Sequence, residues 1–94
     1  MDSYEQKIAE AVSKTLKFYK VDPKRYSFFK ESEEAEYLVF KESNCCYAFY
    51  NRDYGTMNRE LVTSNLGLIA KHMISYFVPS SEYKTACELY CHYI

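Results

Sequence analysis

The chain has 94 residues and a net charge of −1, with 48% apolar and 27% charged residues. These proportions are those of a globular protein, and a chain this short has no room for a second core, so we expect a single domain over residues 1–94. The near-zero net charge disfavours nucleic acid and anionic membranes as partners, and no apolar run approaches the ~20 residues of a membrane span. The N-terminal residues lack the pattern of a signal peptide, which predicts a cytoplasmic location with free thiols.

Tyrosine is over-represented, with 11 Tyr and 6 Phe but no Trp. A tyrosine has an apolar ring and a polar tip, so it suits surfaces that are partly exposed and contact other proteins. Small domains also use tyrosine to cover a core from which water is never fully excluded. The composition therefore favours a protein-binding surface, with core coverage as the alternative use of these rings.

The first predicted helix covers residues 3–20, and Ser3 and Gln6 fit a capping box at its start. A proline after the helix favours its end. The aromatic sequence of residues 25–30 then predicts a first strand. The apolar stripe of the helix consists of Ile8, Val12, Leu16 and Tyr19.

Residues 31–36, with the sequence ESEEAE, form a run of carboxylates. Such a run resists burial, so we expect an exposed hairpin loop. Charge complementarity speeds and orients protein binding, so this loop is also a candidate surface for a basic partner. The candidate partner-binding carboxylates are Glu31, Glu33, Glu34 and Glu36.

Residues 36–51, EYLVFKESNCCYAFYN, predict a β-hairpin with a polar turn at residues 42–44. We expect Leu38 and Phe40 to point to the core, which would leave Tyr37 and Val39 facing outward. A sheet face that still carries rings is a candidate docking surface. The candidate anchors for a partner, including the turn that follows the hairpin, are Tyr37, Tyr47, Tyr50, Asp53 and Tyr54.

Residues 59–63 read either as a short fourth strand or as part of a helix from Asn58 to Phe77. We favour the strand, with Ser64 capping a helix over residues 64–77, because a fourth strand would strengthen a small sheet. After Pro79, Ser80 or Ser81 would cap a last helix. Its predicted packing face contains Tyr83, Cys87, Tyr90 and Ile94. The whole pattern predicts an α+β fold with an N-terminal helix, an antiparallel sheet of three or four strands and two C-terminal helices.

Chemical motifs are weak in this sequence. Two glycines cannot make a glycine-rich phosphate loop, and no nucleophile is placed beside an activating base. Cys87, Cys91, one of the strand cysteines and His72 or His92 could in principle supply zinc ligands, but there is no CxxC pair, and the adjacent Cys45 and Cys46 point to opposite faces of a strand. We therefore expect no enzyme activity, no metal and no cofactor, with the cysteines acting as small apolar residues.

The hairpin sequence EYLVFKESNCCYAFYN, the acidic run before it and the segment RELVTSNLGLIAKHMISYF after it give the chain a family resemblance. It resembles the small cytoplasmic immunity proteins of bacterial contact-dependent inhibition and other polymorphic toxin systems. This resemblance implies an inhibitor that binds a toxin domain, often a nuclease, and blocks its active site. It assigns no individual residue. The alternatives are another small inhibitor or adaptor such as a phage-encoded anti-host protein, a small nucleic-acid-binding module, and a homodimer.

Overall fold

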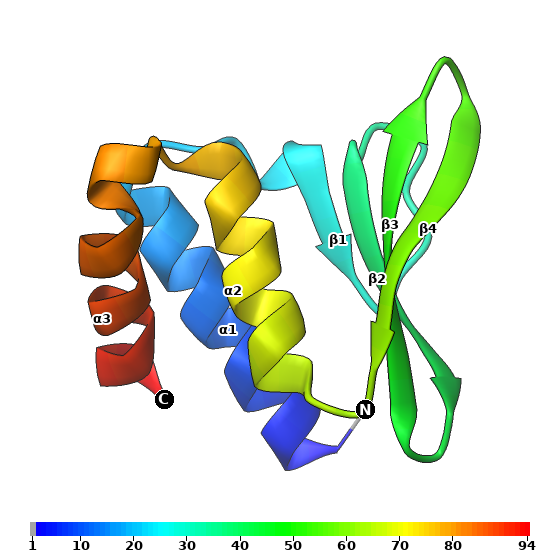
Figure 1. The fold of residues 1–94 in the computed structure, drawn as a ribbon, viewed down its shortest axis with the longest axis horizontal. Coiled ribbons are helices and arrows are strands. Elements are labelled where there is room, and N and C mark those ends of the chain that lie inside the picture. The colour runs from blue at the N-terminus through cyan, green and yellow to red at the C-terminus, as the bar shows by residue number, and fades with distance from the viewer. Residues whose placement is uncertain (1) are drawn as a thin grey trace. The chain divides into compact units, whose positions relative to one another are not determined.

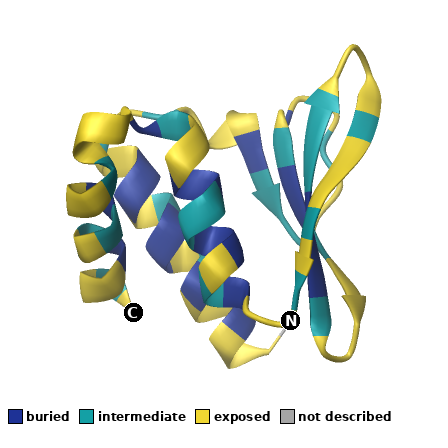
Figure 2. Ribbon diagram, in the orientation of Figure 1, coloured by how far each residue is buried: buried dark blue, intermediate teal, exposed yellow. Residues whose placement is uncertain are grey.

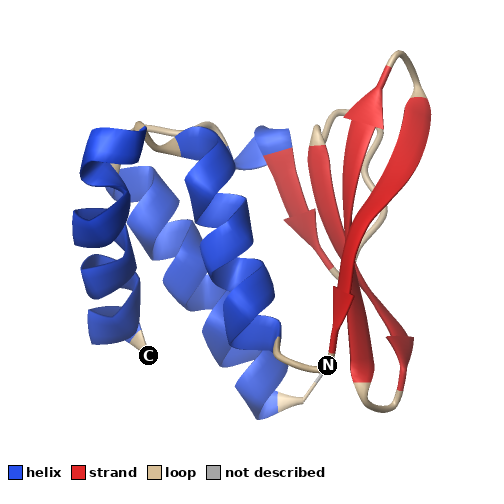
Figure 3. Ribbon diagram, viewed as in Figure 1, coloured by secondary structure: helices blue, strands red, loops and turns tan. Residues whose placement is uncertain are grey.

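The computed structural model describes residues 2–94, and its order of elements confirms the predicted α+β class (Figure 1). Contacts divide the chain into two compact units. The helical unit contains residues up to 22 and residues 70–94, and the sheet unit contains residues 23–69. The strands, drawn in red in Figure 3, all fall within residues 23–69 and so belong to the sheet unit. The expectation of one domain over residues 1–94 stays a prediction. The helices are α1 (Ser3–Phe18), α2 (Leu66–Phe77) and α3 (Tyr83–Tyr93).

The start of α1 is fixed by a capping box one residue earlier than predicted. The Glu5 N–H donates to Asp2 Oδ1 at 2.8 Å, and the Asp2 N–H donates to Glu5 Oε1 at 3.4 Å. The predicted pairing of Ser3 with Gln6 is therefore wrong, because Asp caps a helix as well as Ser does. The apolar stripe is confirmed. The buried residues of α1 are Glu5, Ile8, Ala11, Val12, Thr15 and Leu16.

The end of α1 is a Schellman motif, two residues before the predicted end. The Lys20 N–H donates to the Lys17 carbonyl at 2.9 Å, and the Val21 N–H donates to the Leu16 carbonyl at 3.0 Å. Lys20 has a φ of 61°, the left-handed conformation that glycine usually supplies at this position. Because a lysine is present instead, the sequence carries no glycine signal for this helix end.

The start of α2 is capped by Asn65 rather than by the predicted Ser64. Asn65 Oδ1 accepts the Leu68 N–H at 3.1 Å, which satisfies one of the free donors of the first turn. The Asn65 N–H in turn donates to Thr63 Oγ1 at 3.1 Å. An asparagine and a serine are both good N-caps, so the sequence alone left the choice between neighbours open.

A short 3-10 turn, η2 (Ser80–Glu82), precedes α3. Glu82 occupies the N-cap position and makes no side-chain cap hydrogen bond, so the predicted cap by Ser80 or Ser81 is wrong. The serines lie in η2 because the chain turns once before α3 begins. The predicted packing face of α3 is right for Tyr90, which is 1% exposed, and wrong for Ile94, which is 45% exposed.

The sheet unit opens with the turn η1 (Pro23–Arg25) and holds four strands in chain order. β2, β3 and β4 pair antiparallel, and the favoured fourth strand is confirmed. β1 pairs with β2 in parallel, with Tyr26 opposite Tyr37, so the sheet is mixed rather than wholly antiparallel. The strands are β1 (Tyr26–Phe28), β2 (Tyr37–Ser43), β3 (Cys46–Asp53) and β4 (Thr56–Thr63).

The parallel pairing of β1 changes the role of the acidic residues that follow it. A hairpin loop joins antiparallel strands, whereas residues 29–36 must return the chain to the start of the next parallel strand. The prediction of a hairpin loop at residues 31–36 is therefore wrong. The return is short because β1 has only 3 residues, which extend about 10 Å.

Both faces are buried in the middle of β2 and β3, whereas Phe40, which we expected to point to the core, is half-buried. Val39 and Phe49 are opposite each other on one face, and Phe40 and Ala48 are opposite each other on the other. Leu38 and Val39 both have 0% exposure, so the inward position of Leu38 is confirmed and the outward position of Val39 is wrong. Strands buried on both faces read as continuous apolar runs, which explains the missing polar face of the hairpin sequence. Figure 2 shows this burial and the exposed end of the β3–β4 hairpin.

Candidate functional site

Arg52 on β3 fixes the acidic loop, which we define as residues 31–36. Arg52 Nη1 donates to the carbonyl oxygens of Ser32 at 2.9 Å and Glu33 at 2.6 Å. The same nitrogen donates to the Ala35 carbonyl at 3.1 Å. Ala35 is 1% exposed, so the loop packs against the sheet at that residue. Arg52 thus holds the backbone of the loop inward, and the loop is ordered rather than free.

Three carboxylates of the acidic loop have no partner in the described part of the chain. Glu31, Glu33 and Glu34 are exposed, and none of them forms an ion pair or a side-chain hydrogen bond with any residue in 2–94. Glu36 differs, because it accepts a hydrogen bond from Arg25 Nε at 2.5 Å. Exposed ion pairs of this kind contribute little to stability. The loop therefore presents three exposed carboxylates that form no ion pair of their own.

The tip of the β3–β4 hairpin directly follows Arg52 in the chain. Asp53 is exposed and directly follows Arg52. Tyr54 and Gly55 have φ values of 52° and 81°, the left-handed pair of a type I′ turn. The side chain of Tyr54 is 100% exposed. We call Glu31, Glu33, Glu34, Glu36, Asp53 and Tyr54 the acidic rim.

The conformation of Tyr54 is unusual for its residue type. Left-handed positions favour Gly, Asn and Asp, and an L-residue with a bulky side chain adopts them at a cost of about 1–2 kcal/mol. A fully exposed ring buries no apolar surface that would offset this cost. The sequence signal for the turn was correct, but the position of the ring at its outermost point follows only from the structure.

The remaining candidate tyrosines differ in how much surface they expose. Tyr47 is 8% exposed and contacts the ring of Phe29, so little of its surface is accessible, and its role as a partner anchor stays a prediction. Tyr37 is half-buried and stacks on Phe49 with the ring centroids 5.8 Å apart. Burial raises the pKa of Tyr37, and the neighbouring Glu36 raises it further. Tyr37 directly follows Glu36, one of the residues of the acidic rim.

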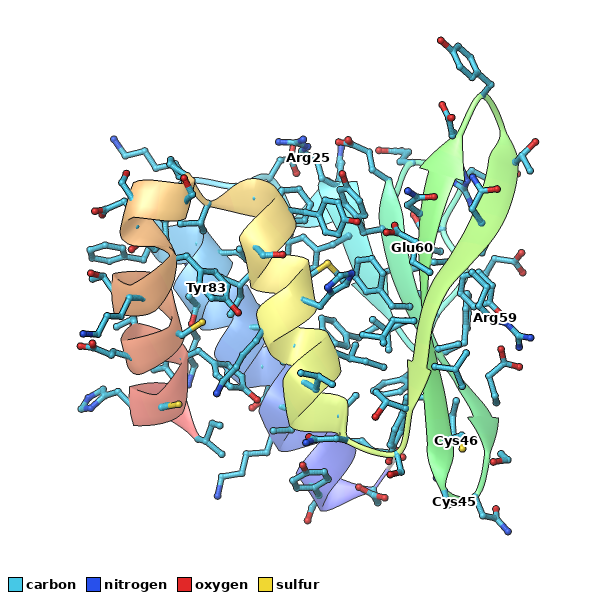
Figure 4. The ribbon with its side chains drawn as sticks, viewed as in Figure 1. Arg25, Cys45, Cys46, Arg59, Glu60 and Tyr83 are labelled. Carbon is cyan, nitrogen blue, oxygen red and sulfur yellow. The ribbon has the colours of Figure 1, made fainter. Side chains whose placement is uncertain are left out.

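Tyr50 belongs to a different cluster, which the sequence did not reveal. The Tyr50 hydroxyl donates to Glu42 Oε1 at 2.8 Å, and Arg59 Nη1 donates to the same oxygen at 2.6 Å. These bonds, that of Arg59 first, hold the pKa of Glu42 below its ordinary value, and the bond to Glu42 raises the pKa of Tyr50. Arg59 lies opposite Tyr50 in the register, and Figure 4 shows it leaving β4 on the side opposite Glu60.

The cysteines and histidines do not form a metal site in the described part of the chain. Within residues 2–94, no group of three or more His, Cys, Asp or Glu side chains is arranged to hold a metal ion. All four cysteines are free thiols, and Figure 4 shows Cys45 and Cys46 at the β2–β3 turn. Cys87 and Cys91 lie elsewhere, on α3. His72 contacts the ring of Tyr76 edge to face, with the centroids 5.2 Å apart.

Comparisons with known proteins give no family for this chain. No protein-family model matches it, and neither the curated proteins nor the solved structures contain a match. Among the helices of residues 2–94, none is both long and apolar enough to cross a membrane. The acidic rim is therefore the feature of this chain that bears most directly on its function.

Proposed function

We propose that this chain is a non-catalytic protein-binding module, an immunity-type inhibitor that binds and neutralises a toxin domain of the nuclease type in the cytoplasm. The observation that carries the proposal is Tyr54, which is fully exposed in a left-handed conformation two residues after Arg52, the side chain that holds the acidic loop. Strained, exposed residues of this kind cluster at functional sites. A partner that covers Tyr54 would bury the ring, and the cost of its conformation would then be offset.

The mechanism would combine charge and steric blocking. A nuclease binds its substrate through Lys and Arg side chains that contact phosphates. The carboxylates of Glu31, Glu33 and Glu34 would pair with such groups and speed the encounter, because complementary charges steer association. Tyr54 would provide the buried aromatic contact that interfaces use as an energetic centre. The inhibitor would need no cofactor and no chemical step.

The test is a titration of the purified chain with the protein encoded immediately upstream of its gene, followed by calorimetry. We expect a one-to-one complex, and we expect Tyr54→Ala to weaken it at least about tenfold, as hot-spot aromatics do. The matched control is Tyr4→Ala, since Tyr4 is also exposed, at 52%, but lies on α1. Absence of a complex, or an equal effect of both variants, would contradict the proposal.

Other inhibitors and adaptors, including phage-encoded ones, would use the same surface, and only the identity of the partner separates them from an immunity protein. A nucleic-acid-binding module would require the opposite charge at the acidic rim. A gel shift with generic RNA and DNA distinguishes this class. We expect no shift at physiological salt, whereas a salt-dependent shift would favour the nucleic-acid module.

A further inference from the structure

A surface cavity of about 540 Å³ lies in the helical unit, beside α3. Its walls come from two helices, because one lining residue belongs to α2 and the others to α3. Figure 4 shows Tyr83 extending from α3 toward α2. The cavity lies outside the acidic rim and plays no part in the proposed function. The lining residues are Lys71, Tyr83, Lys84, Cys87, Glu88 and Cys91.

The charged groups of this cavity are not neutralised by ion pairs. Lys71 is half-buried, and Lys84 and Glu88 are exposed. Within residues 2–94, none of these side chains forms a salt bridge or a side-chain hydrogen bond. The two ammonium groups and the single carboxylate leave the cavity with a net positive charge. Such a cavity favours a ligand that carries carboxylates.

Two thiols line the same cavity, one helical turn apart. Cys91 is exposed, whereas Cys87 is half-buried. The interaction with the Cys87 side chain, followed by burial, raises the pKa of Tyr83. Helical residues four apart have Cβ atoms about 5–6 Å apart, but a disulfide requires about 3.8 Å. The two cysteines therefore cannot form a disulfide with each other while α3 stays helical.

We propose that Cys91 is a site of S-thiolation by an anionic low-molecular-weight disulfide of the glutathione class, bound through its carboxylates by Lys71 and Lys84. The Cys91 thiol loses its proton to solvent, and its sulfur attacks one sulfur of the reagent. The S–S bond of the reagent breaks, a new S–S bond to Cys91 forms, and one thiolate leaves with the electron pair. The reagent disulfide is the only oxidant that this exchange needs.

The geometry also determines how long the adduct persists. A neighbouring thiol that can reach the new disulfide would expel the adduct and form an intramolecular bond. Cys87 cannot do so without breaking helical geometry. The mixed disulfide on Cys91 therefore stays until an external thiol removes it. This makes the site a reversible modification site rather than an intermediate in a dithiol cycle.

The experiment uses the full chain and two reagents, glutathione disulfide and the neutral bis(2-hydroxyethyl) disulfide. Tandem mass spectrometry follows the modification of each cysteine over time. Cys45 is the internal reference, because it is exposed at the β2–β3 turn and lies outside the cavity. We expect the ratio of the Cys91 rate to the Cys45 rate to be about three times higher or more with the anionic reagent, and to fall toward the neutral value at high salt.

Charge variants of the cavity test the role of the lysines. We expect Lys71→Gln/Lys84→Gln to lower the rate ratio with glutathione disulfide to that of the neutral reagent, because the attraction is lost. Glu88→Gln should raise the ratio, since it removes the opposing carboxylate. Cys45 reacts within the same molecules, so a folding defect would change both rates. Equal ratios for the two reagents, or ratios that the variants leave unchanged, would overturn the proposal.

Discussion

Glu42 and the glutamates of the acidic loop have the same kind of side chain, but the hydrogen-bond partners of their carboxylates differ. Glu42 accepts hydrogen bonds from both Tyr50 and Arg59, so its charge is satisfied within the sheet unit. Glu31, Glu33 and Glu34 are held in place only through the backbone of their loop. A satisfied carboxylate stabilises the fold, whereas an ordered but unsatisfied one is available to another molecule. The following substitutions test this difference, in order of decreasing expected change.

The largest effect on stability is expected at Arg52. Arg52→Met keeps much of the apolar stem but removes the hydrogen bonds that hold the acidic loop. We expect the free energy of unfolding to fall by about 2 kcal/mol, because two part-buried carbonyls, of Ser32 and Ala35, and the exposed carbonyl of Glu33 lose a charged donor. Urea unfolding measures the loss, and amide hydrogen exchange should become faster in residues 31–36. Arg59→Met is the control, and a loss as large as that of Arg52→Met would contradict the anchoring role.

Tyr54→Asn should stabilise the chain. Asparagine tolerates the left-handed conformation better than tyrosine, and the exposed ring contributes no packing in the isolated protein. We expect a gain of about 0.5–1 kcal/mol in the free energy of unfolding, measured by thermal or urea denaturation. A loss of similar size would show that the ring has contacts within the chain, and it would remove the main support for the proposed function.

Glu42→Gln should reveal a pH-dependent contribution to stability. The pKa of Glu42 is held below its ordinary value of 4.5 in the folded chain, first by Arg59 and then by Tyr50. A depressed pKa stabilises the fold above the unfolded-state pKa, and the stabilisation is lost as the pH falls through the folded-state pKa. The wild type should therefore exceed Glu42→Gln in stability near neutral pH, and the difference should shrink below about pH 5. A difference independent of pH would contradict this account of Glu42.

The smallest effect on stability is expected in the acidic loop. The triple variant Glu31→Gln/Glu33→Gln/Glu34→Gln removes three charges that have no partner in the described chain. We expect its free energy of unfolding to stay within about 0.5 kcal/mol of the wild type at neutral pH. Urea unfolding in parallel with Glu42→Gln gives the direct comparison. A large loss in the triple variant would mean that these carboxylates are part of the fold.

The sequence predicted the elements that depend on local patterns. Apolar spacing located the buried stripe of α1, and strand-forming residues located β2, β3 and β4. It did not predict the parallel pairing of β1, because strand direction depends on where residues 29–36 return the chain. It also misplaced three helix ends. Asp2 and Asn65 cap the starts of α1 and α2 in place of the expected serines, and Lys20 adopts the left-handed conformation that follows the end of α1.

The candidate site was predicted in composition but not in arrangement. The acidic run and the turn containing Tyr54 are visible as sequence patterns. The hydrogen bonds from Arg52 to the acidic run are not visible in the sequence, because they join residues about 20 positions apart, as in the bond to Ser32. The sequence also did not predict the burial of Tyr47. Its exposure depends on strand register, and a one-residue slip exchanges the two faces of the strand.

The central claim is that the carboxylates of the acidic loop are available for a partner rather than used by the fold. The most direct measurement is the affinity of the upstream-encoded protein for the wild type, for the triple variant at Glu31, Glu33 and Glu34, and for Glu42→Gln, at two salt concentrations. We predict that the triple variant binds at least about tenfold more weakly and loses most of the salt dependence, while Glu42→Gln binds as the wild type does. Equal affinities for the wild type and the triple variant would contradict the claim.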